Sequence, residues 1–382
     1  MTISWVEAGA THSARWQSEA GVAAPKKVLV ADDTIAADTA YRLACEGTAI
    51  LWRGDFHNGR QLLQALARRC DNKSPSKKSA KKRKEEIAPD TPANAFHMHR
   101  LAQAQRARIL GMLLIEVDQG YQITLKRAAD VALACNEAYG PFKKPFVVSM
   151  RELQGLVGAH EWRKKGVYIR TLDANIHPHY GVFSPIRGEY LELIAKAPLP
   201  TTELAFDIGT GTGVIAALLA KRGIKKIIAT DQDPRALLCA RENITSLGLS
   251  EQITVSQTDM FPEGKAALIV CNPPWLPAKP SSPIEYAVYD PDSKMLMAYL
   301  KGLKNHLTQD GEGWLILSDF AEHLGLRSPE FLIDVIKTSG LTVKDKLDIQ
   351  PKHNKVADAE DRLHEARKKE VTSLWVLKKE TN

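Results

Sequence analysis

The sequence of 382 residues has only five cysteines and no long apolar run. The cysteines are Cys45, Cys70, Cys135, Cys239 and Cys271. They form no Cys-x-x-Cys pair and no cluster with histidine, so we expect neither a disulfide framework nor a metal site. No apolar run reaches the roughly 18 residues that a transmembrane helix needs, and the polar start of the chain does not fit a signal peptide. We therefore expect a soluble, cytoplasmic protein that binds neither membrane nor metal.

Positive charge is concentrated in one stretch of the chain. The whole sequence has a formal net charge of +7, and residues 73–86 hold seven basic and two acidic side chains, a net charge of +5. Serine and proline fill the gaps between them, and almost nothing in this stretch is apolar. Such a composition predicts a disordered linker over residues 73–93. This linker is either a solubilising spacer or a salt-sensitive tether for phosphate groups.

An apolar segment followed by alternating glycines is the most informative stretch of the sequence. Residues 204–208 are followed by Gly209, Gly211 and Gly213, and then by the apolar residues 214–220. This order predicts a buried parallel strand, a tight turn and a helix. Glycines let the backbone pass close to a ligand. The third glycine comes one residue too early for the G-x-G-x-x-G pattern of dinucleotide-binding proteins, which argues against a nicotinamide or flavin enzyme.

Strands and helices alternate through this half of the chain, as in a doubly wound α/β sheet. The predicted strands are 204–208, 226–230, 252–256, 267–271, 313–318, 341–347 and 372–378, and the predicted helices are about 213–222, 234–246, 293–306 and 329–339. Polar residues mark the ends of the first four strands, namely Asp207, Asp231, Asp259 and Asn272. In an open sheet of this kind the ligand lies at the carboxyl ends of the strands. We therefore expect these four residues to converge on one site.

The tetrad Asn272-Pro273-Pro274-Trp275 follows the fourth of these strands. The prolines have fixed φ angles and no competing N–H group, so they stiffen the loop. Together with the glycine turn and the acids, the tetrad makes the chain from about residue 183 onward resemble the class I S-adenosylmethionine-dependent methyltransferases. Within them it is similar to the N-methyltransferases with an Asn-Pro-Pro-aromatic motif, which modify exocyclic amines of bases or the side-chain amide of glutamine.

The resemblance implies a seven-stranded class I methyltransferase sheet that ends in a hairpin and binds S-adenosylmethionine at its edge. Asp231 would accept hydrogen bonds from the ribose hydroxyls. Asp259 would accept one from the adenine amino group, with Met260 or Phe261 packing on the ring. The cofactor site would comprise Asp207, Gly209, Thr210, Gly211, Gly213, Asp231, Asp259, Met260 and Asn272.

Methyl transfer from a sulfonium requires an acceptor nitrogen held in line with the C–S bond, at about 3 Å from the methyl carbon. Nitrogens of base amines and amides are poor nucleophiles because their lone pair is delocalised. The Asn272 side-chain oxygen and the Pro273 carbonyl would accept the two N–H hydrogens, while Trp275 stacks on the planar target. We assign Asn272, Pro273, Pro274 and Trp275 to catalysis. We assign no general base, because the proton can leave after transfer.

The N-terminal half carries no comparably specific motif. We divide it into a small α/β unit at 1–72, the linker at 73–93 and an accessory helical and mixed region at 94–166, ahead of the methyltransferase domain at 167–382. The predicted elements are strands 27–31, 48–52 and 112–117 and helices 34–45, 58–69, 94–110 and 125–137. Residues 1–24 show no clear periodicity and are expected to be poorly ordered. The first unit faintly resembles the degenerate N-terminal half of some ribosomal RNA guanine N2-methyltransferases, and an unrelated accessory domain remains the alternative.

Three further segments flank the expected site. Residues 175–190 resemble the segment that covers the cofactor in related enzymes, where His177, His179, Phe183 and Arg187 would line the site, but neither histidine has an acid partner in the sequence and we assign neither to catalysis. The proline-rich loop 276–292, which contains Asp290, is expected to shape the acceptor pocket. Residues 351–370 form a charged insertion, with an exposed helix expected over 358–369.

The reaction type follows from these motifs more firmly than the substrate does. The leading hypothesis is methylation of an exocyclic amine of RNA, most plausibly ribosomal RNA, with the N-terminal half and the basic linker supplying affinity. The alternative is a protein N5-glutamine methyltransferase that acts on a translation factor or ribosomal protein. DNA adenine methylation and methylation of a small molecule come next. A hypothesis from a different class is a non-catalytic RNA-binding module with the same fold.

Overall fold

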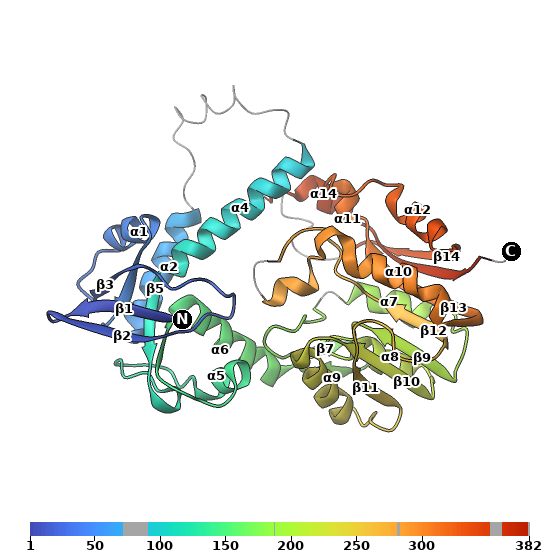
Figure 1. Ribbon diagram of the computed structural model, residues 1–382, viewed down its shortest axis with the longest axis horizontal. Coiled ribbons are helices and arrows are strands. Elements are labelled where there is room, and N and C mark those ends of the chain that lie inside the picture. Colours follow the sequence, from blue (N-terminus) through green and yellow to red (C-terminus); the bar gives the residue numbers. More distant parts are fainter. Residues whose placement is uncertain (72–90, 187, 281–282, 352–360, 381–382) are drawn as a thin grey trace. The chain divides into compact units, whose positions relative to one another are not determined.

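The chain divides into two compact units in the computed structural model (Figure 1). The first unit comprises Met1–Asp90 and His97–Glu161, and the second comprises Thr91–Phe96 and Trp162–Asn382. The structure describes residues 1–71, 91–186, 188–280, 283–351 and 361–380. Most of the predicted linker at 73–93 therefore lies outside the described residues. Among the helices within them, none combines the length and the hydropathy that crossing a bilayer requires.

A six-stranded sheet forms the centre of the first unit, in the order β1-β2-β6-β5-β4-β3. Its strands are β1 (Thr2–Glu7), β2 (Ala10–Trp16), β3 (Lys27–Ala31), β4 (Thr48–Trp52), β5 (Leu113–Val117) and β6 (Phe146–Ser149). Strands β3, β4 and β5 run parallel to one another, and β6 runs antiparallel to β5. The regions 1–72 and 94–166, which the sequence analysis separates, thus contribute strands to one sheet.

The first residues of the chain form a hairpin, so the expectation of poor order over residues 1–24 was wrong for residues 2–16. Ile3 and Trp5 point into the core, where 1% and 5% of their surface is exposed, and their neighbours along β1 face outward. Ala8 and Gly9 join the two strands, and both have positive φ angles, as tight hairpin turns require. Buried and exposed residues alternate over only the six residues of β1. Its outer face includes a valine as well as a serine, so the sequence did not show this alternation clearly.

Among the described residues, five α-helices lie wholly or partly in the first unit. They are α1 (Ala37–Cys45), α2 (Phe56–Asp71), α4 (Pro92–Leu110), α5 (Ala132–Tyr139) and α6 (Met150–Lys165). The helix predicted over 125–137 begins only at α5. Arg127 has a φ of 55°, which breaks a helix, and the Asp130 carboxylate accepts the N–H of Ala132 at 2.9 Å. Local side-chain bonding therefore delays the start of this helix.

A seven-stranded sheet forms the centre of the second unit, in the order β11-β10-β9-β12-β13-β15-β14. Its strands are β9 (Leu204–Ile208), β10 (Lys226–Asp231), β11 (Ile253–Gln257), β12 (Ala266–Cys271), β13 (Leu307–Ser318), β14 (Leu341–Ile349) and β15 (Thr372–Lys379). The first five run parallel, and β15 is antiparallel to both of its neighbours. Each of the seven predicted strands is present. A separate two-stranded ribbon comprises β7 (Val167–Ile169) and β8 (Ala174–Ile176).

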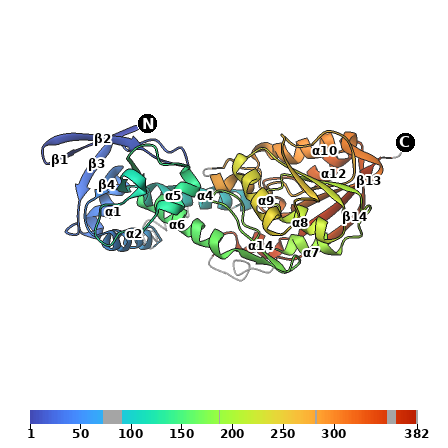
Figure 2. The ribbon, with the colours of Figure 1, turned by 90° about the horizontal axis from the view of Figure 1, so that it is seen from below.

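Helices cover both faces of the larger sheet (Figure 2). Apolar side chains of α7 (Glu189–Lys196), α8 (Val214–Lys221) and α9 (Pro234–Ser246) pack in one core cluster, and those of α10 (Lys294–His306) and α12 (Phe331–Thr338) pack in the other. Strand residues alternate between the two clusters, so the parallel strands are buried on both faces. This burial explains why β12, and β9 apart from Asp207, are apolar throughout.

The insertion between the last two strands is described only in part. Residues 352–360 lie outside the described residues, and a short helix, α14 (His364–Lys369), follows them. Leu363 and Ala366 are buried and pack in a cluster with Phe96, Phe320 and Leu324. The expectation of a fully exposed helix over 358–369 was therefore wrong for its described part, because an apolar face within the charged sequence packs against the second unit.

Candidate active site

The loops that carry the predicted site residues leave the same edge of the larger sheet. Strands β11, β10, β9 and β12 are parallel neighbours, so their carboxyl ends lie side by side. Cys271 and Ile208, the last residues of β12 and β9, are paired in the sheet register. The N–H of Thr210 binds the carbonyl of Thr230 at 2.9 Å and ties the first two loops together. The expected convergence therefore exists at the level of the strand ends.

The glycine turn adopts a conformation that favours glycine at all three positions. The φ angles are 70° at Gly209, 55° at Gly211 and 80° at Gly213, all in the region that side chains disfavour. A Cβ atom at Gly213 would lie 3.3 Å from the Cα of Ala240, so this glycine lets α8 and α9 approach closely. At Gly211 a Cβ atom would meet nothing within 4 Å. The backbone of the turn is therefore open at Gly211.

Asp207 holds this turn from beneath. It is fully buried, and its Oδ2 atom accepts hydrogen bonds from the Thr210 hydroxyl at 2.6 Å and the Ala216 N–H at 3.1 Å. Burial raises the pKa of Asp207 to about 7, and these two hydrogen bonds oppose the rise. Oδ1 has no hydrogen-bond partner among the described residues. Asp207 is thus a buried acid that shapes the glycine turn by binding the Thr210 hydroxyl and the backbone N–H of Ala216.

Asp231 links the second strand to the same turn. Its Oδ2 atom accepts the N–H of Gly211 at 3.0 Å, and its Oδ1 atom accepts the N–H of Asp233 at 3.0 Å. The carboxylate is partly buried, and burial raises its pKa. Each oxygen retains a lone pair beyond the one that these bonds use. Asp231 therefore supports the glycine turn and retains capacity to accept from a ligand.

The third loop contains a strained residue. Met260 has a φ of 95°, which is unusual for a residue with a side chain, and its carbonyl accepts the Thr230 hydroxyl at 2.6 Å. Asp259 beside it is exposed. Phe261 stacks on Tyr299 and on His306, with ring centroids 5.9 Å and 4.3 Å apart, so its ring belongs to the core beneath α10. Of the two residues expected near adenine, Met260 is the one without such ring contacts.

The Asn-Pro-Pro-Trp loop is internally bonded. The indole N–H of Trp275 donates to Asn272 Oδ1 at 2.9 Å, and Pro273 is buried between them. The Trp275 ring is half-buried and packs against both core clusters of the larger sheet. Its carbonyl accepts from Arg327 Nη2 at 3.0 Å. Both the side chain and the backbone of Trp275 are therefore fixed.

Arg327 is the residue of this site that the sequence did not reveal. Its side chain is 3% exposed and also contacts Ser293 Oγ at 3.3 Å and Glu322 Oε1 at 3.4 Å. Burial lowers its pKa, and the nearby Glu322 opposes that change. It lies in the segment after the short helix α11 (Phe320–His323), where no motif marks it. Only the fold brings this arginine under the Trp275 carbonyl.

Asp290, in the loop after the tetrad, has a structural partner. Its carboxylate accepts the N–H groups of Met295 at 2.9 Å and Leu296 at 3.2 Å, and it thereby caps the start of α10. Its own N–H binds the carbonyl of Leu276 at 2.8 Å. Asp290 thus closes the base of the loop onto α10, and a role of the loop in shaping an acceptor pocket stays a prediction.

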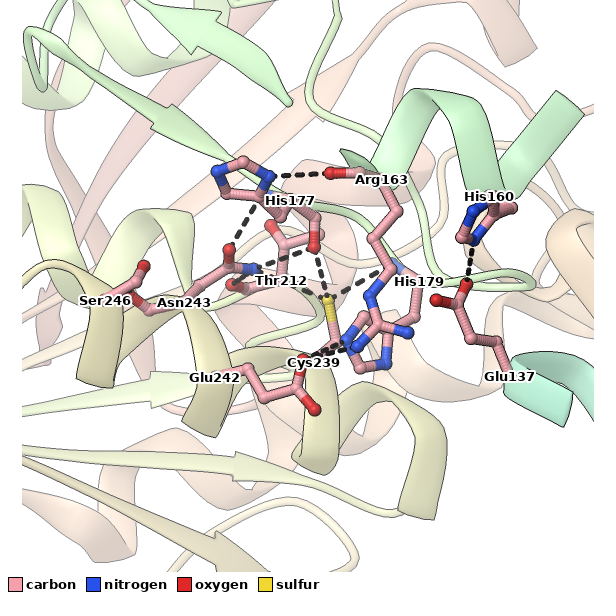
Figure 3. Close-up of polar contacts among 10 residues, drawn as sticks. All are labelled: Glu137, His160, Arg163, His177, His179, Thr212, Cys239, Glu242, Asn243 and Ser246. Carbon is pink, nitrogen blue, oxygen red and sulfur yellow. Dashed lines mark hydrogen bonds and ion pairs between the residues drawn. The ribbon is translucent and has the colours of Figure 1, made fainter. Parts of the chain in front are cut away.

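The segment before α7 is tied to the glycine turn through Asn243 (Figure 3). Asn243 is buried; its Oδ1 accepts the N–H of His177 at 2.8 Å, and its Nδ2 donates to the carbonyl of Thr212 at 3.0 Å. The ring of His179 lies 2.9 Å from Glu242, an acid partner that sequence spacing could not show. Both histidines have protein partners in the structure. Arg187 lies outside the described residues.

Part of the second unit is similar to known proteins. Residues 174–338 match the family model described as "Methyltransferase small domain". This part of the chain is similar to methyltransferase domains of that family. The match and the named relatives below support S-adenosylmethionine as its cofactor. The matched residues include the strand ends β9 to β12, the glycine turn and the Asn-Pro-Pro-Trp loop.

Several proteins named as methyltransferases are similar to part of the chain. The release factor glutamine methyltransferase of Cereibacter sphaeroides is 41% identical over 96 residues, which are 24% of this chain and 34% of that protein. The tRNA1(Val) (adenine(37)-N6)-methyltransferase of Pedobacter heparinus is 31% identical over 155 residues, 39% of this chain and 63% of that protein. The ribosomal protein L11 methyltransferase of Vibrio cholerae is 33% identical over 99 residues, which are 26% of this chain and 34% of that protein. The chain spans less than two thirds of the length of each relative.

Proposed function

We propose that this chain transfers a methyl group from S-adenosylmethionine to an exocyclic amine of RNA, with ribosomal RNA as the expected substrate. The observation that carries the proposal is the pairing of strand ends β9 and β12, which sets the glycine turn beside the Asn-Pro-Pro-Trp loop. A cofactor loop and an acceptor loop must adjoin for direct transfer, because the acceptor nitrogen has to approach the methyl carbon closely. The adjacent ends of β9 and β12 support this arrangement.

The residues at the turn suit this cofactor. The open backbone at Gly211 allows close approach, and Asp231 beside it retains lone pairs for the ribose hydroxyls. S-adenosylmethionine supplies, when bound, an electrophilic methyl group on a sulfonium. The strained Met260 and the exposed Asp259 follow the next strand, where we place the adenine. Asp207 remains beneath the turn and acts on the ligand through the backbone that it holds.

For the substrate nitrogen that receives the methyl group, the tetrad supplies oxygen atoms that accept hydrogen bonds. Its prolines add no competing N–H donors. Asn272 Oδ1 receives the Trp275 indole on one lone pair and has a second for an N–H of the substrate. The Pro273 carbonyl would receive the other N–H. Two such bonds turn the nitrogen lone pair out of conjugation and toward the methyl group. The prolines offer no N–H of their own, so the acceptor meets no competing donor from them.

The charge of the chain supports RNA over a protein substrate. Residues 73–86 carry a net charge of +5 in the sequence, and such a segment attracts phosphates in a salt-dependent way. We place it, with the first unit, in the role of supplying affinity. The tRNA methyltransferase among the relatives modifies an exocyclic base amine.

A protein N5-glutamine methyltransferase is the second candidate. The relative with 41% identity, from Cereibacter sphaeroides, is named for glutamine methylation of a release factor. A glutamine amide presents the same two N–H groups on a planar carbon as a base amine does. The tetrad therefore serves either acceptor, and the substrate would be a translation factor or a ribosomal protein.

Labelling separates the two candidates. Purified protein is incubated with tritiated S-adenosylmethionine and a lysate from a strain that lacks the gene, and the products are treated with ribonuclease or protease. We expect ribonuclease to release the label and protease to leave it in place. Protease-sensitive label would overturn the RNA assignment in favour of the glutamine candidate. If neither fraction contains more label than a parallel reaction with the Asn272→Ala variant, methyl transfer itself is refuted.

A further inference from the structure

The Asn272 carboxamide is held in one of its two flipped orientations. Its oxygen lies 2.9 Å from Nε1 of Trp275. An indole nitrogen can only donate a hydrogen bond, so the amide atom that faces it has to be the oxygen, and the NH₂ group points away. The orientation of this amide is thus imposed by a neighbour within the same loop.

Trp275 is itself fixed, which makes it a rigid reference for the amide. Its half-buried ring packs against the core clusters on both faces of the sheet. Its carbonyl binds the buried Arg327 at 3.0 Å. A ring anchored in this way cannot follow a planar substrate without disturbing the core. Stacking, the role that the sequence suggests for this residue, does not use its N–H group or explain its anchoring.

We propose that Trp275 is a positioning residue whose indole N–H fixes the Asn272 carboxamide so that Oδ1 receives an N–H of the methyl acceptor. This inference rests on the proposed function and assigns the aromatic position of the motif a second role. With the amide flipped, its NH₂ group would face the N–H of the acceptor, and two donors would oppose each other. The indole N–H prevents that arrangement. Phenylalanine at this position retains the ring and loses the donor.

The kinetic test compares two tryptophan-to-phenylalanine variants. Trp275→Phe removes the N–H that binds Asn272. Trp314→Phe, the control, removes an indole bond of 3.2 Å to the buried Glu312; Trp314 lies in β13 beside β12, and its single indole N–H binds Glu312 and not the tetrad. We expect kcat of Trp275→Phe to fall about tenfold, the scale of one hydrogen bond, while KM for S-adenosylmethionine changes less than twofold.

The control should show a lower melting temperature and an unchanged kcat when both variants are assayed well below their melting points. A loss of stability alone would reduce the active fraction of both proteins without this contrast. If Trp275→Phe retains the kcat of the wild type, or if both variants lose kcat equally, the positioning role is overturned.

The bond itself is tested without any substrate. In proton–nitrogen spectra, the indole N–H signal of Trp275 is assigned by its loss in Trp275→Phe. In Asn272→Ala this signal should shift upfield and exchange faster with solvent, because its acceptor is gone. An unchanged signal would overturn the inference. If the wild type methylates neither RNA nor protein, the proposed function fails, whereas the indole signal still decides whether Trp275 orients Asn272.

Discussion

Both units of this chain place acids at or near the carboxyl ends of their strands and use them differently. In the first unit, Arg53 after β4 binds Glu7 at 2.8 Å and Glu116 at 2.7 Å. In the second, Asp207 and Asp231 accept hydrogen bonds from backbone N–H groups in and near the glycine turn and from the Thr210 hydroxyl, and among the described residues no cation contacts them. The first arrangement neutralises charge within the protein, and the second shapes a backbone that a ligand can approach.

The pKa values follow the same division. The hydrogen bond from Arg53 lowers the pKa of Glu7 to about 2. Burial raises the pKa of Asp207 to about 7. Position at a strand end therefore does not make a binding site by itself. A site requires acids that are buried against an open turn, and perturbed pKa values of this kind are common where ligands bind.

The largest effect that would test this comparison is loss of turnover in Asn272→Ala. The variant lacks the acceptor oxygen that we assign to the substrate N–H, so turnover should fall about 100-fold or more. Affinity for S-adenosylmethionine should stay within a few-fold, measured by calorimetry. The control is Asn58→Ala, which removes an exposed amide that binds Asp33 at 2.9 Å in the first unit. Comparable turnover in the two variants would contradict the assignment of the site to the second unit.

Stability as a function of pH should distinguish the two kinds of acid. Because the pKa of Asp207 rises from 3.8 to about 7 on folding, the folded state binds the proton more tightly. Protonation of Asp207 therefore increases the free energy of unfolding. This stabilisation is fully present below about pH 4 and is lost as the pH rises to 7. In Asp207→Asn the free energy of unfolding should decline less with rising pH. The difference should be about 2–4 kcal/mol, a magnitude that follows from the size of the pKa shift of Asp207. Urea unfolding between pH 4.5 and 7.5 measures it.

The control for this experiment is Glu7→Gln. The lowered pKa of Glu7 means that its contribution is present above about 4.5 and is lost as the pH falls toward 2. Glu7→Gln should therefore leave the slope between pH 5 and 7 unchanged. If the slope of Asp207→Asn equals that of the wild type, the proton is not held at Asp207. Asp231, whose pKa is also raised by burial, would then be the source to examine.

Cofactor affinity should be sensitive to Asp231 and insensitive to the equivalent acid of the first unit. Asp231→Ala removes a carboxylate that we assign to the ribose, and binding of S-adenosylmethionine should weaken by about 1–3 kcal/mol. Asp33→Ala is the matched control, because Asp33 follows β3 and also accepts a backbone N–H, that of Asp55 at 3.1 Å. Equal affinities of the two variants, measured by calorimetry, would remove Asp231 from the site.

Much of the second unit could be predicted because its signals are local. The apolar run and glycines at 204–213 predict a strand and a turn without reference to the rest of the chain, and β9 lies where the pattern placed it. The order of the strands at the sheet edge follows from general rules for parallel sheets. The first unit was harder to predict, because pairing of β2 with the distant β6 depends on contacts that no local pattern encodes.

The contacts that orient the site residues could not be predicted for the same reason. Sequence spacing identified the Asn-Pro-Pro-Trp loop, but not that the Trp275 indole binds Asn272. Asp290 appeared as a candidate for the pocket, whereas its carboxylate caps α10. Such roles depend on the three-dimensional direction of a side chain, which a motif does not specify.

The smallest expected effect concerns Arg327, which no sequence signal marked. Arg327→Lys keeps a positive charge but has one nitrogen, so it cannot bind the Trp275 carbonyl and Glu322 through separate nitrogens, as the guanidinium does through Nη2 and Nη1. The tetrad should loosen, so kcat should fall a few-fold, less than in Trp275→Phe, while KM for the cofactor stays constant. Arg106→Lys is the control, because Arg106 binds the exposed Asp71 through two nitrogens in the first unit. Equal kcat values for the two variants would show that the carbonyl of Trp275 needs no anchor, and the position of the tetrad would then depend on packing alone.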